Sequence, residues 1–179
     1  MSKASTMDIR LADEQDLPRI VEIYNAAVPS RRSTADTETV TPDDRREWFR
    51  QHEPARRPLL VGEDEGGIVA WMSFEDFYGR PAYAHTAELS IYIAPDYQGR
   101  LLGKRLLQRA EALAPSLDIH TLVGYVFAHN TPSLRLLRAS GYQEWGRLPD
   151  VARMDGSDFS LCILGKRLDS APAPLGQPA

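Results

Sequence analysis

A loop that combines glycine with basic residues is the first segment of the chain whose residue types could do chemistry. It reads Gln98-Gly99-Arg100-Leu101-Leu102-Gly103-Lys104 and lies between an apolar strand pattern and a helical pattern. The free N–H groups of a helix start, the positive end of the helix dipole and nearby glycines all suit a pyrophosphate. The loop has neither a three-glycine dinucleotide-binding fingerprint nor the Gly-Lys-Ser/Thr of a Walker A loop. The alternative is an ordinary strand-to-helix turn with solvated basic residues.

Glu88 is the second candidate, because it interrupts a strand pattern that otherwise suits burial. Residues 86–93 alternate between two faces, and Glu88 lies on the face that carries the polar side chains. A carboxylate in such a strand must line a cleft, pair with another group or face water on an open sheet. In a cleft, desolvation would raise its pKa toward the range that suits a general base.

Two further segments carry polar groups that could bind a ligand. Residues 74–85 place several aromatic side chains around Arg80, whose guanidinium could grip a carboxylate. Asn130 follows a strand pattern and precedes a helical one, where its amide could contact a ligand. The alternatives are an aromatic loop that packs on the core and, for Asn130, a turn or cap residue.

The remaining reactive residue types indicate no other chemistry. Cys162 lies in an apolar strand pattern, so we expect it to pack in the core rather than act as a nucleophile. The four histidines, His52, His85, His120 and His129, show no metal-ligand spacing with one another and no Ser-His-Asp arrangement. We therefore predict no metal site.

Composition limits the class of protein. The 179 residues include 21 basic and 25 acidic side chains, so the formal charge is −4 and nucleic acid is not expected as a partner. A single cysteine allows no intramolecular disulfide, which favours a cytoplasmic location. No apolar run approaches the ~18 residues of a membrane span. We expect a soluble, one-domain protein.

The positions of apolar and turn-forming residues predict the elements that must hold these groups. They indicate a mixed α/β domain over residues 8–168, with a flexible N-terminus at 1–7 and a proline-containing disordered tail at 169–179. Helices are expected over 17–28, from Thr41-Pro42 through Phe49, over 102–114, and from Thr131 to Gly141. Strands are expected over 59–63, 68–75, 86–93, 119–127, 142–148 and 159–168.

The order of these motifs resembles the GNAT superfamily of N-acetyltransferases. Glu88 precedes the loop 98–103, and Asn130-Thr131-Pro132-Ser133 begins 27 residues after Gly103, followed by Gly141-Tyr142. The run from Phe77 to Tyr92, with Ile23-Tyr24-Asn25 and the pair Arg46-x-Trp48, is similar to the phosphinothricin and methionine sulfoximine acetyltransferase branch. The resemblance covers about residues 8–168.

The resemblance implies a mixed sheet of six or seven strands flanked by about four helices. Two parallel strands, 86–93 and 119–127, would splay apart to admit acetyl-CoA. It assigns the backbone of Ile91 and Ile93 to the pantetheine arm, the loop from Gln98 to Lys104 to the pyrophosphate, and Asn130 and Ser133 to the length of the cofactor. It places Arg80, Tyr83 and Thr86 at the acceptor site. Relatives in this branch usually form homodimers.

The implied reaction is acetyl transfer from acetyl-CoA to the amine of a small molecule, an amino acid or an analogue. Glu88 would act as general base, through a water molecule, and a backbone N–H near Ile91 would polarise the thioester carbonyl. Leu101 replaces the usual glycine, and Leu137 replaces the usual tyrosine or histidine. Residues 156–160 lack the tryptophan and aspartate of this branch. The proton donor and the particular amine therefore stay open.

Two other functions remain open from the sequence. The first is acetylation of protein N-termini or lysines, which would need an open groove for a peptide. The second is a non-catalytic acyl-CoA-binding sensor, which Leu101 and Leu137 would favour.

Overall fold

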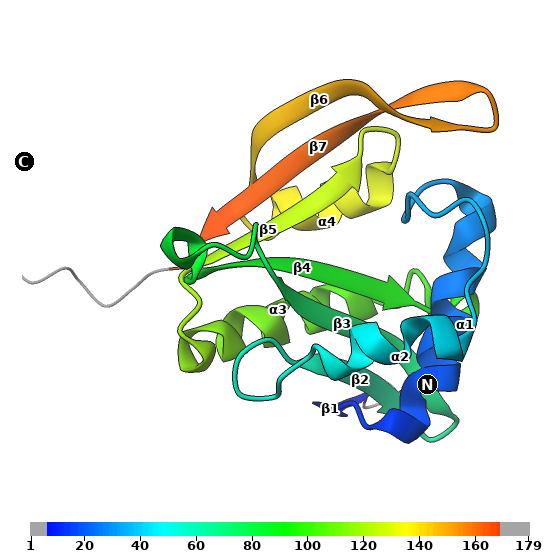
Figure 1. Ribbon diagram of the computed structural model, residues 1–179, viewed down its shortest axis with the longest axis vertical. Coiled ribbons are helices and arrows are strands. Elements are labelled where there is room, and N and C mark those ends of the chain that lie inside the picture. Colours follow the sequence, from blue (N-terminus) through cyan, green and yellow to red (C-terminus); the bar gives the residue numbers. More distant parts are fainter. Residues whose placement is uncertain (1–6, 169–179) are drawn as a thin grey trace, which may run out of the picture.

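A seven-stranded sheet with helices on both faces forms the fold of the computed structural model, which describes residues 7–168 (Figure 1). The strand order is β1-β2-β3-β4-β5-β7-β6. The strands are β1 (Asp8–Leu11), β2 (Leu59–Asp64), β3 (Gly67–Asp76), β4 (Thr86–Ile93), β5 (Thr121–Phe127), β6 (Gln143–Met154) and β7 (Ser157–Arg167). The helices are α1 (Leu17–Ala27), α2 (Pro42–Arg50), α3 (Leu102–Leu113) and α4 (Thr131–Ala139). The predicted mixed α/β fold is confirmed.

One strand pair differs from the others, because β4 and β5 run parallel whereas the other paired strands of the described chain are antiparallel. Their register contains three pairs, Thr86 with Thr121, Ala87 with Leu122 and Glu88 with Val123. Beyond Glu88, β4 continues beside β3 and β5 continues beside β7, so the two parallel strands separate. The predicted splay therefore lies at Glu88.

The two faces of the sheet have separate apolar cores. On one face, Leu106 and Leu107 of α3 pack with Leu89 of β4 and with partly buried leucines of α4. On the other face, Ile20 and Ile23 of α1 pack with aromatic side chains of β3 and β4, and α2 adds Trp48 and Phe49. Because side chains alternate along a strand, β4 turns its odd-numbered residues toward α3 and its even-numbered residues toward α1 and α2.

Polar capping fixes the starts of two helices. Thr41 caps α2, because its hydroxyl oxygen accepts from the Asp44 N–H at 3.2 Å while the Asp44 carboxylate accepts from the Thr41 N–H at 2.8 Å. Asn130 caps α4, because its side-chain oxygen accepts from the Ser133 N–H at 3.3 Å. Among the described residues, no side chain caps α3, so its first-turn N–H groups have no protein acceptor of that kind.

The structure differs from the sequence prediction at both ends of the domain. β1 was not predicted, since four residues are too few for a clear alternation, yet it pairs with β2. β6 extends to Met154 rather than Leu148, because the pairing with β7 resumes at Ala152 after an irregular stretch containing Pro149. The predicted tail, 169–179, and residues 1–6 lie outside the described residues. Met7, predicted to be flexible, is buried against Gly62.

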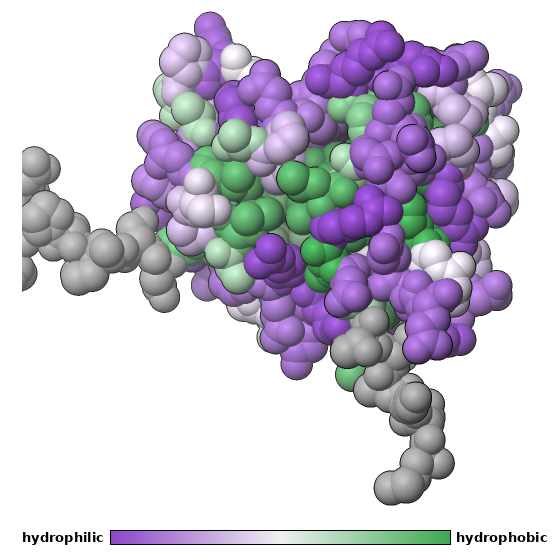
Figure 2. Space-filling model, turned by 90° about the horizontal axis from the view of Figure 1, so that it is seen from below, coloured by the Kyte–Doolittle hydropathy of each residue, from purple (hydrophilic) through white to green (hydrophobic). Residues whose placement is uncertain are grey.

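The exposed surface contains apolar as well as polar groups. Figure 2 shows hydrophobic residues gathered in the middle of the face seen from below, with hydrophilic residues around them. At the β1 edge, Leu11 is 47% exposed.

Cys162 is buried in β7, as expected for a core residue. Within residues 7–168, no helix has the length and apolar character needed to cross a membrane.

Candidate active site

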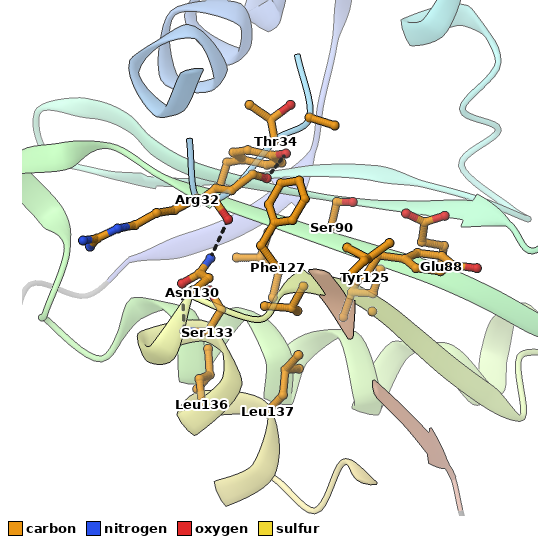
Figure 3. Close-up of a pocket in the computed structure, with 18 of the residues that line it drawn as sticks. Arg32, Thr34, Glu88, Ser90, Tyr125, Phe127, Asn130, Ser133, Leu136 and Leu137 are labelled. Carbon is orange, nitrogen blue, oxygen red and sulfur yellow. Dashed lines mark hydrogen bonds between the residues drawn. The ribbon is translucent and has the colours of Figure 1, made fainter. Parts of the chain in front are cut away.

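The separation of β4 from β5 opens a cavity of about 480 Å³ in the sheet. Side chains and backbone of β4, β5 and α4 line it, together with the segment 32–35 that precedes α2. Figure 3 shows Glu88 and Tyr125 at one end of this cavity and Asn130 and Ser133 at the other. We call this cavity the strand slot.

Beyond Glu88, the backbone of β4 turns polar groups into the strand slot, on the side where no strand of the described residues pairs with it. The Ala94 N–H donates to the Val69 carbonyl oxygen at 2.9 Å, which directs the N–H of Ala94 toward β3. Because N–H directions alternate along a strand, the N–H groups of Ile91 and Ile93 point the other way, to the side that β5 has left. The Gln98 side-chain amide donates to the freed Ile93 carbonyl oxygen at 3.3 Å. The predicted residues Ile91 and Ile93 thus offer backbone donors at this edge.

The start of α3 has the form of an anion cradle. Gly99 and Leu101 have positive φ angles of 75° and 62°, which bend the chain into the helix. Leu101 is 73% exposed, and the described first turn contains no acidic residue. At Gly103, an added Cβ would lie 2.9 Å from Leu136 Cδ2, so a larger residue there would displace the Leu136 side chain of α4. The backbone N–H groups in the first turn of α3 are therefore available to an anion beside α4, the helix that lines the slot.

The basic residues of this loop do not act as one cluster. The guanidinium of Arg100 lies over the ring of Tyr97, 4.7 Å from its centroid. Arg105 instead donates to the Met7 carbonyl oxygen at 2.9 Å and thereby fastens the N-terminal end of the domain. Although Arg105 directly follows Lys104 in the sequence, its guanidinium contacts the backbone of Met7.

A strap formed by residues 31–36 crosses the strand slot. Tyr92 of β4 donates to the Ser33 carbonyl oxygen at 2.8 Å, and the Asn130 amide donates to the Arg32 carbonyl oxygen at 3.1 Å (Figure 3). Arg31 forms an ion pair with Asp155 of the β6–β7 hairpin at 2.7 Å. The strap thus connects β4, α4 and the hairpin across the opening.

Asn130 is primarily a structural residue. Its side chain is buried, its oxygen caps α4 and its amide holds the strap. The polar atoms of Asn130 therefore serve as a helix cap, which was the alternative interpretation from the sequence. Asn130 and Ser133 also line the slot, where the cofactor assignment places them.

Glu88 is the titratable group at the point where the strands separate. Burial, and to a smaller extent the negative charge of Glu75, raises the pKa of its carboxyl group to about 7. Glu75 lies directly opposite Glu88 in the antiparallel register of β3 and β4. The alternative of a water-facing surface glutamate is therefore wrong, since Glu88 lines the slot. A carboxyl group of this pKa can accept and release a proton near neutral pH.

Side chains around Glu75 hold its carboxylate in place. The Trp48 indole N–H donates to Glu75 Oε1 at 3.1 Å, and the Ser73 hydroxyl lies 3.4 Å from the same oxygen. His52 Nε2 lies 3.9 Å from it, and burial lowers the pKa of His52. Trp48, Ser73 and Glu75 border a second cavity of about 140 Å³ between the sheet and helices α1 and α2.

The three residues assigned to the acceptor lie on or beside the β3–β4 loop. Arg80 and Tyr83 are exposed on this loop, and Thr86 begins β4. None of them is among the described residues that line either cavity. Tyr83 instead contacts Phe77 and Tyr78, with ring centroids 5.4 and 5.9 Å apart, in an aromatic cluster at the loop.

Sequence reasoning missed several slot residues. Tyr125 and Phe127 share the face of Glu88, because Val123 pairs with Glu88 and side chains alternate along β5. Burial and the nearby charge of Glu88 raise the pKa of Tyr125. The alternation within 121–127 could have identified both residues, whereas no local signal identifies Thr34 of the strap.

Comparisons with known proteins agree with this geometry. The sequence model of the acetyltransferase (GNAT) family matches residues 17–142. YwnH of Bacillus subtilis, provisionally named a phosphinothricin acetyltransferase, is 52% identical over 163 residues, which are 90% of this chain and 99% of that protein. MnaT of Escherichia coli, an L-amino acid N-acyltransferase, is 33% identical over 168 residues, 94% and 98% of the two chains.

A solved structure of yncA from Salmonella typhimurium contains its cofactor acetyl-CoA and has a TM-score of 0.85 to this chain. The two sequences are 32% identical, and the match covers 94% of this chain and 97% of the yncA chain. The residues of this chain fit the same group. Open backbone donors lie along β4, the slot separates β4 from β5, and α3 begins with uncapped amides. The chain therefore belongs to the GNAT family and is an acetyl-CoA-dependent N-acetyltransferase.

Proposed function

We propose that this chain is a cytoplasmic enzyme that acetylates the α-amine of a free amino acid or amino-acid analogue, with Glu88 as general base. The observation that carries the proposal is the slot-lining carboxyl of Glu88, with its pKa near 7, at the branch point of β4 and β5. The buried, unpaired thiol of Cys162 is in keeping with a reducing compartment.

The chemistry requires a base because an α-amine has a reference pKa of ~7.7–8.0 and is largely protonated at neutral pH. Acetyl-CoA supplies the acetyl group as a thioester. Glu88, through a water molecule, takes the proton of the ammonium, and the freed lone pair forms the new N–C bond as the C–S bond breaks. The Ile91 N–H is the donor that we assign to the acetyl carbonyl oxygen. The nitrogen still carries one proton more than the amide after this bond forms, and it releases that proton as the thiolate leaves. The thiolate takes up one proton, so the two transfers balance, and no residue is assigned as the donor to sulfur.

The remaining cofactor contacts follow from the same elements. We assign the backbone of Ile93 to the pantetheine arm and the α3 start, from Gln98 to Lys104, to the pyrophosphate. Leu101 contributes its amide, and its exposed side chain leaves the helix start open. Asn130 and Ser133 bound the slot along the cofactor.

The proposed acceptor class rests on relatives and on the loop before β4. Relatives include an L-amino acid N-acyltransferase and an L-methionine sulfoximine/L-methionine sulfone acetyltransferase of Salmonella typhimurium, 32% identical to this chain. We assign Arg80 to the acceptor carboxylate, with Tyr83 and Thr86 beside it. In the hairpin where the branch has tryptophan and aspartate, Asp158 instead pairs with Arg153 at 3.1 Å and Ser160 with Asp150 at 3.1 Å. Side chains other than that tryptophan and aspartate therefore shape this hairpin.

We also propose that the protein is a homodimer through the exposed edge strand β6. Trp145, Leu148 and Val151 leave 41–56% of their surfaces exposed on this edge. Exposed large apolar side chains on an edge strand are typical of an interaction surface.

The dimer predicts a mass in sedimentation equilibrium of twice that of the chain at micromolar concentration. Leu148→Asp should yield the monomer, because it would bury a charge in the interface. Leu11→Asp, on the opposite sheet edge and 47% exposed, is the matched control and should remain dimeric. A monomeric wild-type protein would contradict the assignment.

Replacement of the proposed base tests the mechanism. Glu88→Gln should lower kcat about 10²- to 10⁴-fold, because the water loses its proton acceptor, and should leave the KM for acetyl-CoA nearly unchanged. The measurement is thiol release from acetyl-CoA with a panel of free amino acids, methionine sulfoximine and phosphinothricin. Glu65→Gln, in the exposed β2–β3 turn, is the control and should retain full activity. Unchanged turnover by Glu88→Gln would remove the base assignment, and faster turnover with a peptide N-terminus would replace the acceptor class.

The pair of carboxylates predicts a shift in pH dependence. Glu75→Gln removes the negative charge opposite Glu88, so the pKa of Glu88 should fall and the base should be active at lower pH. The acid limb of the kcat profile at saturating substrate should move down by roughly half to one pH unit. The ionisation of the amine is the same for both enzymes, so the difference between profiles reports the protein. An unshifted or upward-shifted limb would show that Glu88 does not control it.

A further inference from the structure

We propose that His85, Asp118 and His120 form a binding site for one divalent transition-metal ion of the zinc type, which fastens the β3–β4 loop to β5. The three residues lie before the N-terminal ends of β4 and β5, whereas the strand slot opens toward the other end. The metal site therefore shares no residue with the proposed acetyl-transfer site, and it does not depend on the function proposed above.

The donor atoms have the spacing that a small tetrahedral ion requires. His120 Nε2 lies 3.3 Å from Asp118 Oδ1, and His85 Nδ1 lies 3.2 Å from Asp118 Oδ2. One donor atom from each of the three residues lies within 4.8 Å of the others. Tetrahedral ligands about 2.0–2.1 Å from zinc are about 3.4 Å apart, so only small side-chain movements would be needed.

The backbone brings the two histidines together before any ion binds. The parallel register pairs Thr86 with Thr121, so the residues that precede them are neighbours. The His120 N–H donates to the His85 carbonyl oxygen at 2.8 Å, and the Leu168 N–H donates to the His120 carbonyl oxygen at 2.8 Å. The two imidazole rings are stacked, with centroids 4.7 Å apart and planes 8° from parallel.

Asp118 is held toward both rings by the local backbone. It follows the 3₁₀ segment η5 (Ala114–Leu117) with a φ angle of 56°, a left-handed conformation that aspartate tolerates. Its N–H donates to the Pro115 carbonyl oxygen at 3.1 Å. Its carboxylate is left to face His85 and His120.

The donor types favour zinc-like ions over magnesium or calcium, since imidazole nitrogen suits the former and oxygen the latter. Three protein ligands leave a position for water, in keeping with the exposure of all three side chains. His85 Nδ1 also lies 3.0 Å from the Asp118 carbonyl oxygen, a contact in which it donates a proton. Metal binding at Nδ1 would move that proton to Nε2 and replace the contact by a metal–nitrogen bond.

The position of the site indicates what the ion would do. His85 ends the loop that carries the cluster of Phe77, Tyr78 and Tyr83, and it lies three residues before Glu88. An ion shared with His120 and Asp118 would tie the end of this loop to the start of β5. The histidines are 35 positions apart, so their spacing predicted no site, and the parallel register creates the juxtaposition.

The test measures binding of Zn²⁺ and Co²⁺ to protein without a polyhistidine tag, by calorimetry and by visible absorption of Co²⁺. We expect one ion per chain, a dissociation constant of about 10 µM or tighter, and a tetrahedral Co²⁺ spectrum. His85→Ala, His120→Ala and Asp118→Asn should each weaken binding at least about tenfold. Asparagine keeps the size of Asp118 and tolerates its φ angle, so this variant removes charge with little risk to folding.

His129→Ala is the matched control, because His129 is exposed but its Nε2 lies 2.7 Å from the Arg31 carbonyl oxygen, away from the proposed site. It should bind metal like the wild type. Zinc should also raise Tm in the wild type and His129→Ala but not in Asp118→Asn. Binding that is weaker than millimolar, or that is equal in all variants, would overturn the proposal. So would equal loss in His129→Ala, which would show adventitious coordination only.

Discussion

The site depends on one constraint, which is that the parallel strands β4 and β5 pair over a short stretch and then separate. β4 and β5 pair from Thr86 to Glu88 and then part, and this leaves backbone donors of β4 without a partner strand. Unpaired N–H groups at a sheet interior are costly unless a ligand or water satisfies them. The strap and the α4 cap at Asn130 border this opening, and the Asn130 side chain connects the two.

Glu88 follows from the same geometry. It is the last residue of β4 that still pairs with β5, so its side chain lies where the sheet is continuous on one side and open on the other. Burial there raises the pKa of its carboxyl group, and Glu75 across the β3–β4 pair adds to the effect. A buried, repelled carboxyl group costs stability at the pH where it ionises, and such a cost is common at functional sites. The proton affinity needed for base chemistry is thus a property of the sheet register.

Local sequence patterns predicted the elements because their signals are local. The alternation over 86–93 identified β4 at its observed bounds, and the Thr41-Pro42 cap identified the start of α2. The position of Glu75 opposite Glu88 could not be predicted, since it depends on the β3–β4 register. The same holds for the strap, which is held by hydrogen bonds to residues about 60 to 100 positions away, and for the pair His85 and His120. The order of the family motifs predicted which residues should lie along the cofactor. Arg105 shows that basic residues close in sequence need not act together.

The most direct test is amide hydrogen exchange of β4, measured by NMR with and without acetyl-CoA. If the freed backbone of β4 holds the cofactor, the amides of Ile91 and Ile93 should exchange rapidly alone and slow at least about tenfold on binding. The amides of Tyr92 and Ala94, which face β3, should be protected in both states. Slowed exchange at the start of α3 with no change at Ile91 would contradict the account, because the cofactor would then bind without entering between β4 and β5.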